Sequence, residues 1–218
     1  KSSIKCDSSV MSPSAFPRFI SYLFHPLFMP FLGLIFFYFS NKINNFNLYT
    51  SPSVHQDNLK IISITILFSL IIPGALVYIL KKTNRIESYH MHSKEERLLP
   101  FSFMGLSMFS AYYTIFDYFD VQAEPIIKVF YFGCLLSIIL ALLITTRWKI
   151  SIHMIGIGGF TGAIFLLNYL SFSDNLTFLV GAILAAGLVA YSRLTLKAHS
   201  LKQVIAGFLL GFLCETFF

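Results

Sequence analysis

The stretch from Ile126 to Thr146 reads IIKVFYFGCLLSIILALLITT, and Lys128 is its single charged residue. A helix needs about 20 mainly apolar residues to cross the hydrocarbon core of a bilayer, so this stretch predicts a transmembrane helix. The whole chain agrees, because 56% of its 218 residues are hydrophobic and 12% are charged. A soluble domain carries roughly 25% charged residues. The chain is therefore predicted to be an integral membrane protein.

Further apolar stretches on both sides of this one predict an all-α fold, a polytopic transmembrane helix bundle of about six to seven spans. Residues 1–15 are polar and are expected to form a loose N-terminal segment, and residues 16–218 a single transmembrane helical domain. The first span carries three prolines, so we expect it to be kinked or partly interfacial. The predicted spans are Phe16–Phe39, Leu59–Leu80, Pro100–Phe119, Ile126–Thr146, His153–Leu170, Leu176–Ser192 and Ser200–Phe218.

Charged residues are distributed unevenly between the two sides of the predicted bundle. With seven spans, the N-terminus and the loops after the second, fourth and sixth spans share one side, here named side A. Side A carries thirteen basic and four acidic residues, a net charge of +9, and the opposite side carries three basic and six acidic residues, a net charge of −3. Because lysine and arginine are in excess in cytoplasmic loops, we expect side A to face the cytoplasm, in a bacterial inner membrane. Some of these cations could also bind an anion.

Three side-A segments contain the residue types of a phosphate-binding site. Arg97 and Arg193 suit a phosphate because each guanidinium offers a planar fork of donors. His153 and His199 can act as nucleophile or as proton donor near neutral pH. In a plainer interpretation, the arginines anchor helix ends at headgroups and the histidines are interfacial polar residues. The segments are Tyr89–Pro100, Arg147–His153 and Ser192–Gln203.

Two glycine pairs and one pair of histidines suggest other roles. Gly158 and Gly162, and likewise Gly207 and Gly211, have the small-xxx-small spacing of close helix contacts. His90 and His92 resemble half of a metal site, but further ligands at suitable spacing are missing. We therefore expect neither a metal ion nor another cofactor.

The third segment has the most specific pattern. Ser192-Arg193 is followed after five residues by His199, and Gln203 comes four residues later. This pattern resembles the last signature of the type 2 phosphatidic acid phosphatase and vanadium haloperoxidase superfamily, SR-x5-H-x3-D. The aspartate of that signature is replaced here by Gln203.

The two earlier signatures of the superfamily are less well kept. Ser151 and His153 preserve the serine and histidine of the second signature, PSGH. The first signature, K-x6-RP, is kept only in part. Its arginine and proline are present, but two leucines separate Arg97 from Pro100, and His90 stands in the place of the lysine. The three segments follow one another in the superfamily's order, and the resemblance covers residues 85 to 215.

The resemblance implies a lipid phosphate phosphatase with a phosphohistidine intermediate. His199 would attack phosphorus, His153 would protonate the leaving alkoxide, and Gln203 would orient His199. The substrate would be a phosphate monoester or pyrophosphate on a lipid or polyprenyl chain, and no metal is implied. The implied phosphate ligands are Arg97, Arg193 and Ser151, with Lys94 or His90 in place of the missing lysine.

Gln203 leaves a second hypothesis open. Its amide carries no charge, and the comparable acid-to-amide change in serine proteases costs about 10⁴ in rate. The chain would then be an inactive relative, a lipid-binding or structural subunit of a membrane complex. A transporter is a third hypothesis, for which the sequence offers no evident intramembrane acid. No nucleic-acid partner is expected.

Overall fold

A computed structural model describes residues 15–43, 52–86, 95–119, 121, 125–171 and 176–217. All its elements are helical within these ranges, which confirms the predicted all-α class. In chain order they are α1 (Ala15–Leu23), the 3₁₀ turn η1 (Pro26–Phe28), α2 (Met29–Ile43), α3 (Pro52–Thr65), the π-helical turn η2 (Ile66–Ile71), α4 (Ile72–Lys82), α5 (Glu95–Tyr113), the π-helical turn η3 (Thr114–Tyr118), α6 (Pro125–Thr145), α7 (Ile152–Ser171), α8 (Leu176–Thr195) and α9 (Leu201–Phe217).

The described chain has the dimensions and the surface of an integral membrane protein. Six helical segments are long and apolar enough to cross a membrane. Their outward faces carry large apolar side chains, such as Leu106, Leu143 and Leu184, that are mostly exposed. An exterior with so many large apolar side chains is suited to lipid rather than water. The segments are Ala15–Tyr38, Asp57–Lys82, Glu96–Tyr118, Pro125–Thr145, Ile152–Leu170 and Leu176–Thr195.

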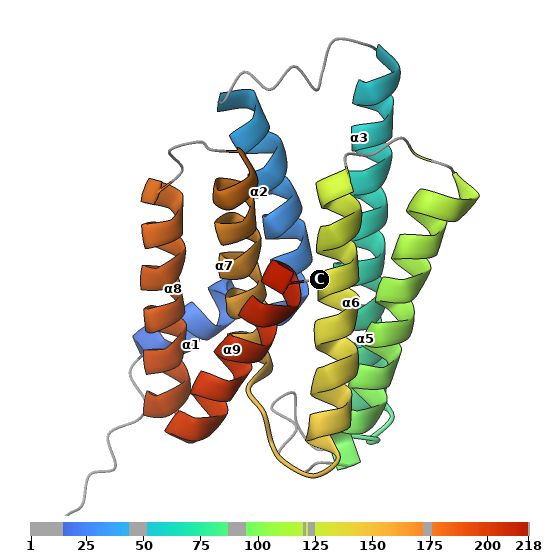
Figure 1. Cartoon of the computed structure of the whole chain (residues 1–218). Helices are drawn as coiled ribbons and strands as arrows, with labels where there is room; N and C mark the ends of the chain where they lie inside the picture. The colour runs from blue at the N-terminus through green and yellow to red at the C-terminus, as the bar shows by residue number, and fades with distance from the viewer. Residues whose placement is uncertain are drawn as a thin grey trace, which may run out of the picture.

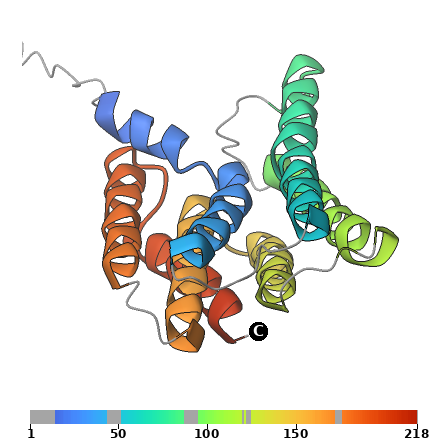
Figure 2. The ribbon, with the colours of Figure 1, turned by 90° about the horizontal axis from the view of Figure 1, so that it is seen from above.

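The long helices run side by side, and the short helix α1 runs across them against one side of α8 (Figures 1 and 2). Viewed along the bundle, α3, α5 and α6 form one group, and α1, α2, α7, α8 and α9 form another (Figure 2). The C-terminal ends of α6 and α8 and the N-terminal ends of α5, α7 and α9 lie at the same end, the lower one in Figure 1. The described parts of the three side-A segments are therefore gathered at one end, as parity predicted.

The first predicted span is broken where His25 meets Pro26. His25 has extended backbone angles (φ −68°, ψ 137°), as expected for a residue that precedes proline. The chain turns there from α1 into α2, so the predicted kink is present. Phe16, Phe19 and Tyr22 on α1 are exposed, which gives this crossing helix an aromatic face of the type that favours the membrane interface.

Helix α9 differs from the predicted seventh span. It has 17 residues and is not among the six segments of spanning length. Its last turn contacts α6 near its middle, where a Cβ atom on Gly133 would lie 2.6 Å from Glu215 Oε2. Glu215, which the charge count assigned to the side opposite side A, is 2% exposed and lies inside the bundle. The sequence argument against a transporter, that no intramembrane acid is present, was therefore wrong.

The predicted glycine contacts are confirmed where α7 crosses α9. A Cβ atom on Gly211 would lie 2.0 Å from the carbonyl oxygen of Ile155, and one on Gly158 would lie 2.3 Å from that of Phe208. Side chains larger than hydrogen would force the helices apart. At the same crossing Gly207 packs against the backbone of Ser151. A Cβ atom on Gly207 would lie 2.6 Å from the carbonyl oxygen of Ser151. The crossing thereby fixes the start of α7 against the second turn of α9.

Candidate anion-binding site

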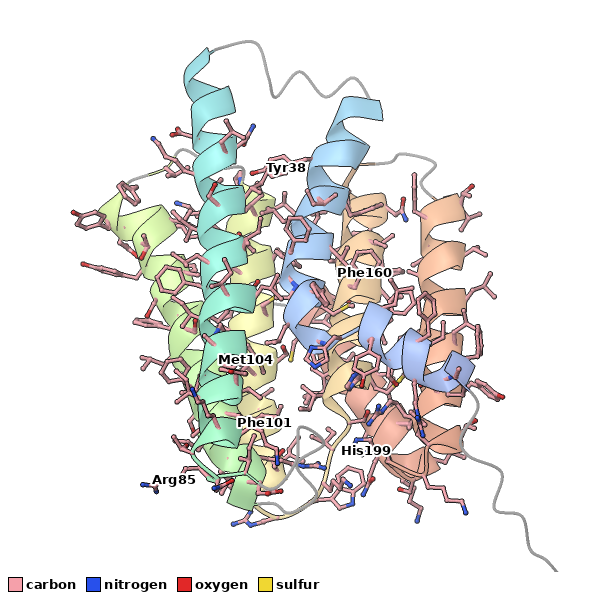
Figure 3. All side chains as sticks on the ribbon, turned by 180° about the vertical axis from the view of Figure 1, so that it is seen from behind. Tyr38, Arg85, Phe101, Met104, Phe160 and His199 are labelled. Carbon is pink, nitrogen blue, oxygen red and sulfur yellow. The ribbon has the colours of Figure 1, made fainter. Side chains whose placement is uncertain are left out.

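The described residues of the predicted phosphate site all come to the side-A end of the bundle. Arg97 lies in the first turn of α5, His153 in the first turn of α7 with Ser151 just before it, and Arg193 in the last turn of α8. His199 lies in the connection between α8 and α9, at the same end as Arg85 (Figure 3). Lys94 and His90, and also His92, lie outside the described residues.

The connection after α8 turns His199 back toward Arg193. Lys197 adopts a left-handed conformation with φ of 51°, and the amide of Ala198 donates a 3.1 Å hydrogen bond to the carbonyl of Arg193. This is the geometry of a helix C-cap. The five residues between Arg193 and His199 therefore form one tight turn, which accounts for their spacing.

Gln203 holds both His199 and the start of α9. Its Oε1 lies 3.1 Å from Nδ1 of His199 and accepts a 3.1 Å hydrogen bond from the backbone N–H of Ser200. The second contact is half of a capping box, in which the third helical residue binds the N-cap amide. Because Oε1 is an acceptor, Nδ1 of His199 carries the proton in this pair and Nε2 keeps its lone pair.

The surroundings of His199 favour its neutral form. Burial lowers the pKa of His199 to about 4, and the neighbouring guanidinium of Arg193 is the next largest cause. Lys149 and Arg97 lower this pKa further, whereas the hydrogen bond to Gln203 raises it. The charged groups that shift His199 are therefore all basic within the described chain. At neutral pH its imidazole is an uncharged nucleophile or acceptor.

Lys149 is a member of the cluster that sequence reasoning did not single out. Burial lowers its pKa, and Arg97 and Arg193 lower it further, so the three cations are close neighbours. The sequence did offer a signal for Lys149, because it stands two residues before Ser151 in a segment already assigned to the predicted phosphate site. A lysine with a lowered pKa that repels two arginines is stabilised by any anion that enters among them.

Arg193 is held by a chain of hydrogen bonds that ends on α1. Its Nη1 donates to Ser21 Oγ over 3.0 Å, and Ser21 Oγ lies 2.6 Å from Ser192 Oγ. The Ser192 hydroxyl in turn donates to the carbonyl of Pro17 over 2.6 Å. Ser192 therefore joins α8 to α1 rather than facing the cluster. Arg193 Nε is buried and has no partner.

His153 contacts a second histidine that the sequence did not connect with it. The rings of His25 and His153 are edge-to-face with their centroids 5.4 Å apart. His153 also lies beside the backbone of Ser21 and within electrostatic reach of Arg193 and His199. The sequence offered one signal that His25 belongs to the site: it is a polar residue directly before a proline in an otherwise apolar span.

Ser151 is the most enclosed member of the set. It is 0% exposed, and its hydroxyl has no hydrogen-bond partner. A buried hydroxyl without a partner costs about 1–3 kcal/mol. Ser151 Oγ and Arg193 Nε are therefore two buried donors, from two of the three predicted signatures, that an oxyanion could satisfy.

The fold and the site together define an integral membrane protein with a buried cationic cluster at one end of its helix bundle. Within the described part of the chain, no group of three or more histidine, cysteine or acidic side chains is arranged to hold a metal ion. Comparison of the chain with protein-family models, with curated proteins and with solved structures finds no match.

Proposed function

We propose that the cationic cluster binds the phosphate of a membrane lipid or polyprenyl phosphate, and that His199 hydrolyses it. The observation that carries the proposal is the pair of buried donors without partners, Ser151 Oγ and Arg193 Nε, beside Arg97 and Lys149. Phosphoryl transfer depends mainly on positioning and on neutralising the charge of the phosphate oxygens. Lys149 takes the place of the lysine that is missing from the first signature.

In the proposed reaction, Nε2 of neutral His199 attacks phosphorus while Gln203 holds the proton on Nδ1. The N–P bond forms as the bond from phosphorus to the lipid oxygen breaks, and His153 delivers a proton to that oxygen. Water then attacks the phosphohistidine and gives a proton back to His153 as the N–P bond breaks, which releases inorganic phosphate and restores both neutral His199 and the proton donor. Arg97, Arg193 and Ser151 hold the phosphate oxygens throughout.

We also propose an orientation. The side-A end carries the lysine and arginine excess, and such an excess marks the cytoplasmic side of a membrane. The cluster would then open to the cytoplasmic leaflet of a bacterial inner membrane.

The reaction is tested by measuring phosphate release from phosphatidic acid and from undecaprenyl pyrophosphate by the purified protein in lipid nanodiscs. Wild type is expected to release phosphate, and His199→Ala to lose release by at least 10³-fold, on the scale that loss of a nucleophile has in other enzymes. Lys202→Ala, an exposed position on α9, is the matched control and should retain the wild-type rate. Release that is unaffected by His199→Ala, or no release from any lipid phosphate, contradicts the proposal.

Gln203 favours a second candidate function, a lipid-phosphate-binding subunit without turnover. A neutral amide stabilises the imidazolium of a phosphohistidine less than a carboxylate does. This candidate predicts that lipid phosphate binds but is not hydrolysed, that His199→Ala is tolerated in cells, and that the protein co-purifies with a larger assembly from mildly solubilised membranes.

A further inference from the structure

A cavity of about 60 Å³ lies at the centre of the bundle, between the two groups of helices. Its walls are mainly apolar, and Met104 on α5 and Phe160 on α7 line it from the two groups (Figure 3). One water molecule needs about 10–15 Å³ of such space, so the cavity has room for a few waters and not for a lipid chain. No arginine is among the described residues that line it, so it is separate from the proposed phosphate site.

One polar group on this wall lacks a partner within the described chain. Ser69 on η2 is 5% exposed, and its hydroxyl forms no hydrogen bond. The neighbouring carbonyl of Phe68 is satisfied, because it accepts a 2.5 Å hydrogen bond from Ser107 Oγ. An unsatisfied buried hydroxyl costs about 1–3 kcal/mol. A water in the cavity removes that cost, since buried waters bind polar groups that otherwise have no partner.

The second polar group is the buried carboxyl of Glu215, which lines the cavity from α9. A Cβ atom on Gly133 would lie 2.6 Å from its Oε2, which places the carboxyl at the depth of the middle of α6. The titratable groups beside it are the thiols of Cys134 and Cys214, and none of the described lining residues is basic. A carboxylate buried without a cation is so costly that the group takes up a proton instead.

Water is the occupant that both the size and the lining of the cavity fit. Ser69, Ser137 and Glu215 contribute polar atoms from η2, α6 and α9, and a buried water typically forms about three hydrogen bonds. The Ser137 hydroxyl donates to the carbonyl of Cys134 over 2.8 Å, so its lone pairs remain available to water. An amine that ionised Glu215 would bury two charges in place of none, at several kcal/mol per ion.

We propose that Glu215 is a proton-binding site at membrane depth, in contact with ordered water that fills the cavity between Glu215 and Ser69. The protonated carboxyl donates a hydrogen bond to this water, and the water in turn satisfies Ser69. In proton exchange, the acid passes its proton to the water and receives another from it, so no charge is left in the cavity. Acidic residues at membrane depth form proton relays in pumps and transporters. The site does not depend on phosphate hydrolysis.

The water is tested by X-ray hydroxyl-radical footprinting of the wild-type protein in lipid nanodiscs, since radicals formed from a trapped water oxidise the side chains beside it. Met108 lines the cavity and is 2% exposed. Met154 is 3% exposed and lies outside the lining, in an apolar cluster with Ile20 and Val204. Met108 should be converted to its sulfoxide as the dose rises, and Met154 should not. Equal protection of the two methionines would show that the cavity is dry.

Ser69→Leu, which fills the cavity and removes its unsatisfied hydroxyl, should abolish the oxidation of Met108. The matched control is Ser110→Leu, which replaces an exposed hydroxyl of α5 that is bonded to its own helix and should leave the oxidation unchanged. Oxidation of Met108 that survives Ser69→Leu would contradict a water in this cavity.

The proton is tested by infrared difference spectroscopy of the wild type against Glu215→Gln at pH 7. Exposed carboxyls are ionised at this pH, so the carbonyl band of a neutral carboxylic acid should be present in the wild type and lost in the variant. The band should shift when D₂O replaces H₂O, because water reaches the carboxyl. Glu215→Gln should keep the oxidation of Met108, since the amide leaves the water in place. Absence of the band, or a band that D₂O does not shift, would overturn the proposal.

Discussion

At the scale of single residues, Gln203 determines what His199 can do. Its amide oxygen binds the N-cap amide of α9 as well as the imidazole, so it cannot turn its nitrogen toward His199 without losing both bonds. The ring is held in one tautomer without a negative charge beside it. Burial and the guanidinium of Arg193 lower the pKa of His199 to about 4, and Gln203 adds no negative charge to oppose them, so the ring stays neutral far below neutral pH.

The substitution Gln203→Glu is predicted to raise the pKa of His199, because a carboxylate stabilises the imidazolium form. Attack requires the neutral ring, so wild-type phosphate release should decline as pH falls through about 4. In the variant this decline should occur at higher pH. At pH 8 the variant should release phosphate faster by about 10² or more, the reverse of the loss caused by an acid-to-amide change. The pH–rate profile of both proteins measures these effects.

The control for this prediction is Lys202→Glu, which adds a carboxylate one residue away at an exposed position of α9. In Lys202→Glu, phosphate release should decline at nearly the same acidic pH as in the wild type, the decline here named the acid limb of the pH–rate profile. An acid limb that does not move in Gln203→Glu, or that moves equally in both variants, contradicts the role assigned to Gln203.

The sequence was sufficient for some of these residues and not for others. Arg97, Arg193, Ser151 and the two histidines stand in short segments whose order and spacing indicated a common site. The inclusion of Lys149 depends on distances between the α6–α7 connection and two other helices. Spacing along the chain does not report such distances.

At the scale of elements, the crossing of α7 and α9 positions the site. Two glycine pairs four residues apart predicted a close contact, and they form one. The sequence could not show that the two pairs meet each other, nor that α9 reaches Gly133 on α6. Helix pairing in a membrane follows from surface fit rather than from hydrophobicity, because lipid is equally apolar.

Gly211→Ala is predicted to destabilise the protein by about 1–3 kcal/mol, the usual cost of overpacking, since its methyl group would lie 2.0 Å from a backbone oxygen. Phosphate release should also fall because Ser151 would shift away from His199. Thermal unfolding in detergent and the release assay measure the two effects. Gly187→Ala, where nothing lies within 4 Å of the added carbon, is the control. Equal stability of the two variants would show that the crossing is not tight.

At the scale of the whole molecule, hydropathy predicted most of the architecture. The apolar stretches correspond to the helices, and the prolines of the first span mark a true break between α1 and α2. The charge count described the basic end well but misplaced Glu215. Counting charges on each side of the membrane assumes that every charged residue lies in a loop. Glu215 breaks this assumption because it lies inside the bundle.

The proposed orientation predicts which end of the molecule a membrane-impermeant thiol reagent can reach in right-side-out vesicles. In a Cys6→Ser background, Tyr118→Cys, at the end opposite the cluster, should react from outside. Lys202→Cys, at the cluster end, should react only after the vesicles are opened. The two remaining cysteines, Cys134 and Cys214, are not exposed. The reverse pattern of labelling would place the cluster on the outer face.

The most direct test of the central claim is a comparison of two lipids that differ only in the phosphate, dioctanoyl phosphatidic acid and dioctanoylglycerol, by equilibrium binding to the purified protein. The phosphate-bearing lipid should bind at least tenfold more tightly, since each charge-assisted hydrogen bond is worth about 1.5–3 kcal/mol. Arg193→Gln should remove this difference, and Arg18→Gln, at an exposed arginine of α1, should keep it. Equal binding of the two lipids, or an equal loss in both variants, would contradict a phosphate site at the cationic cluster.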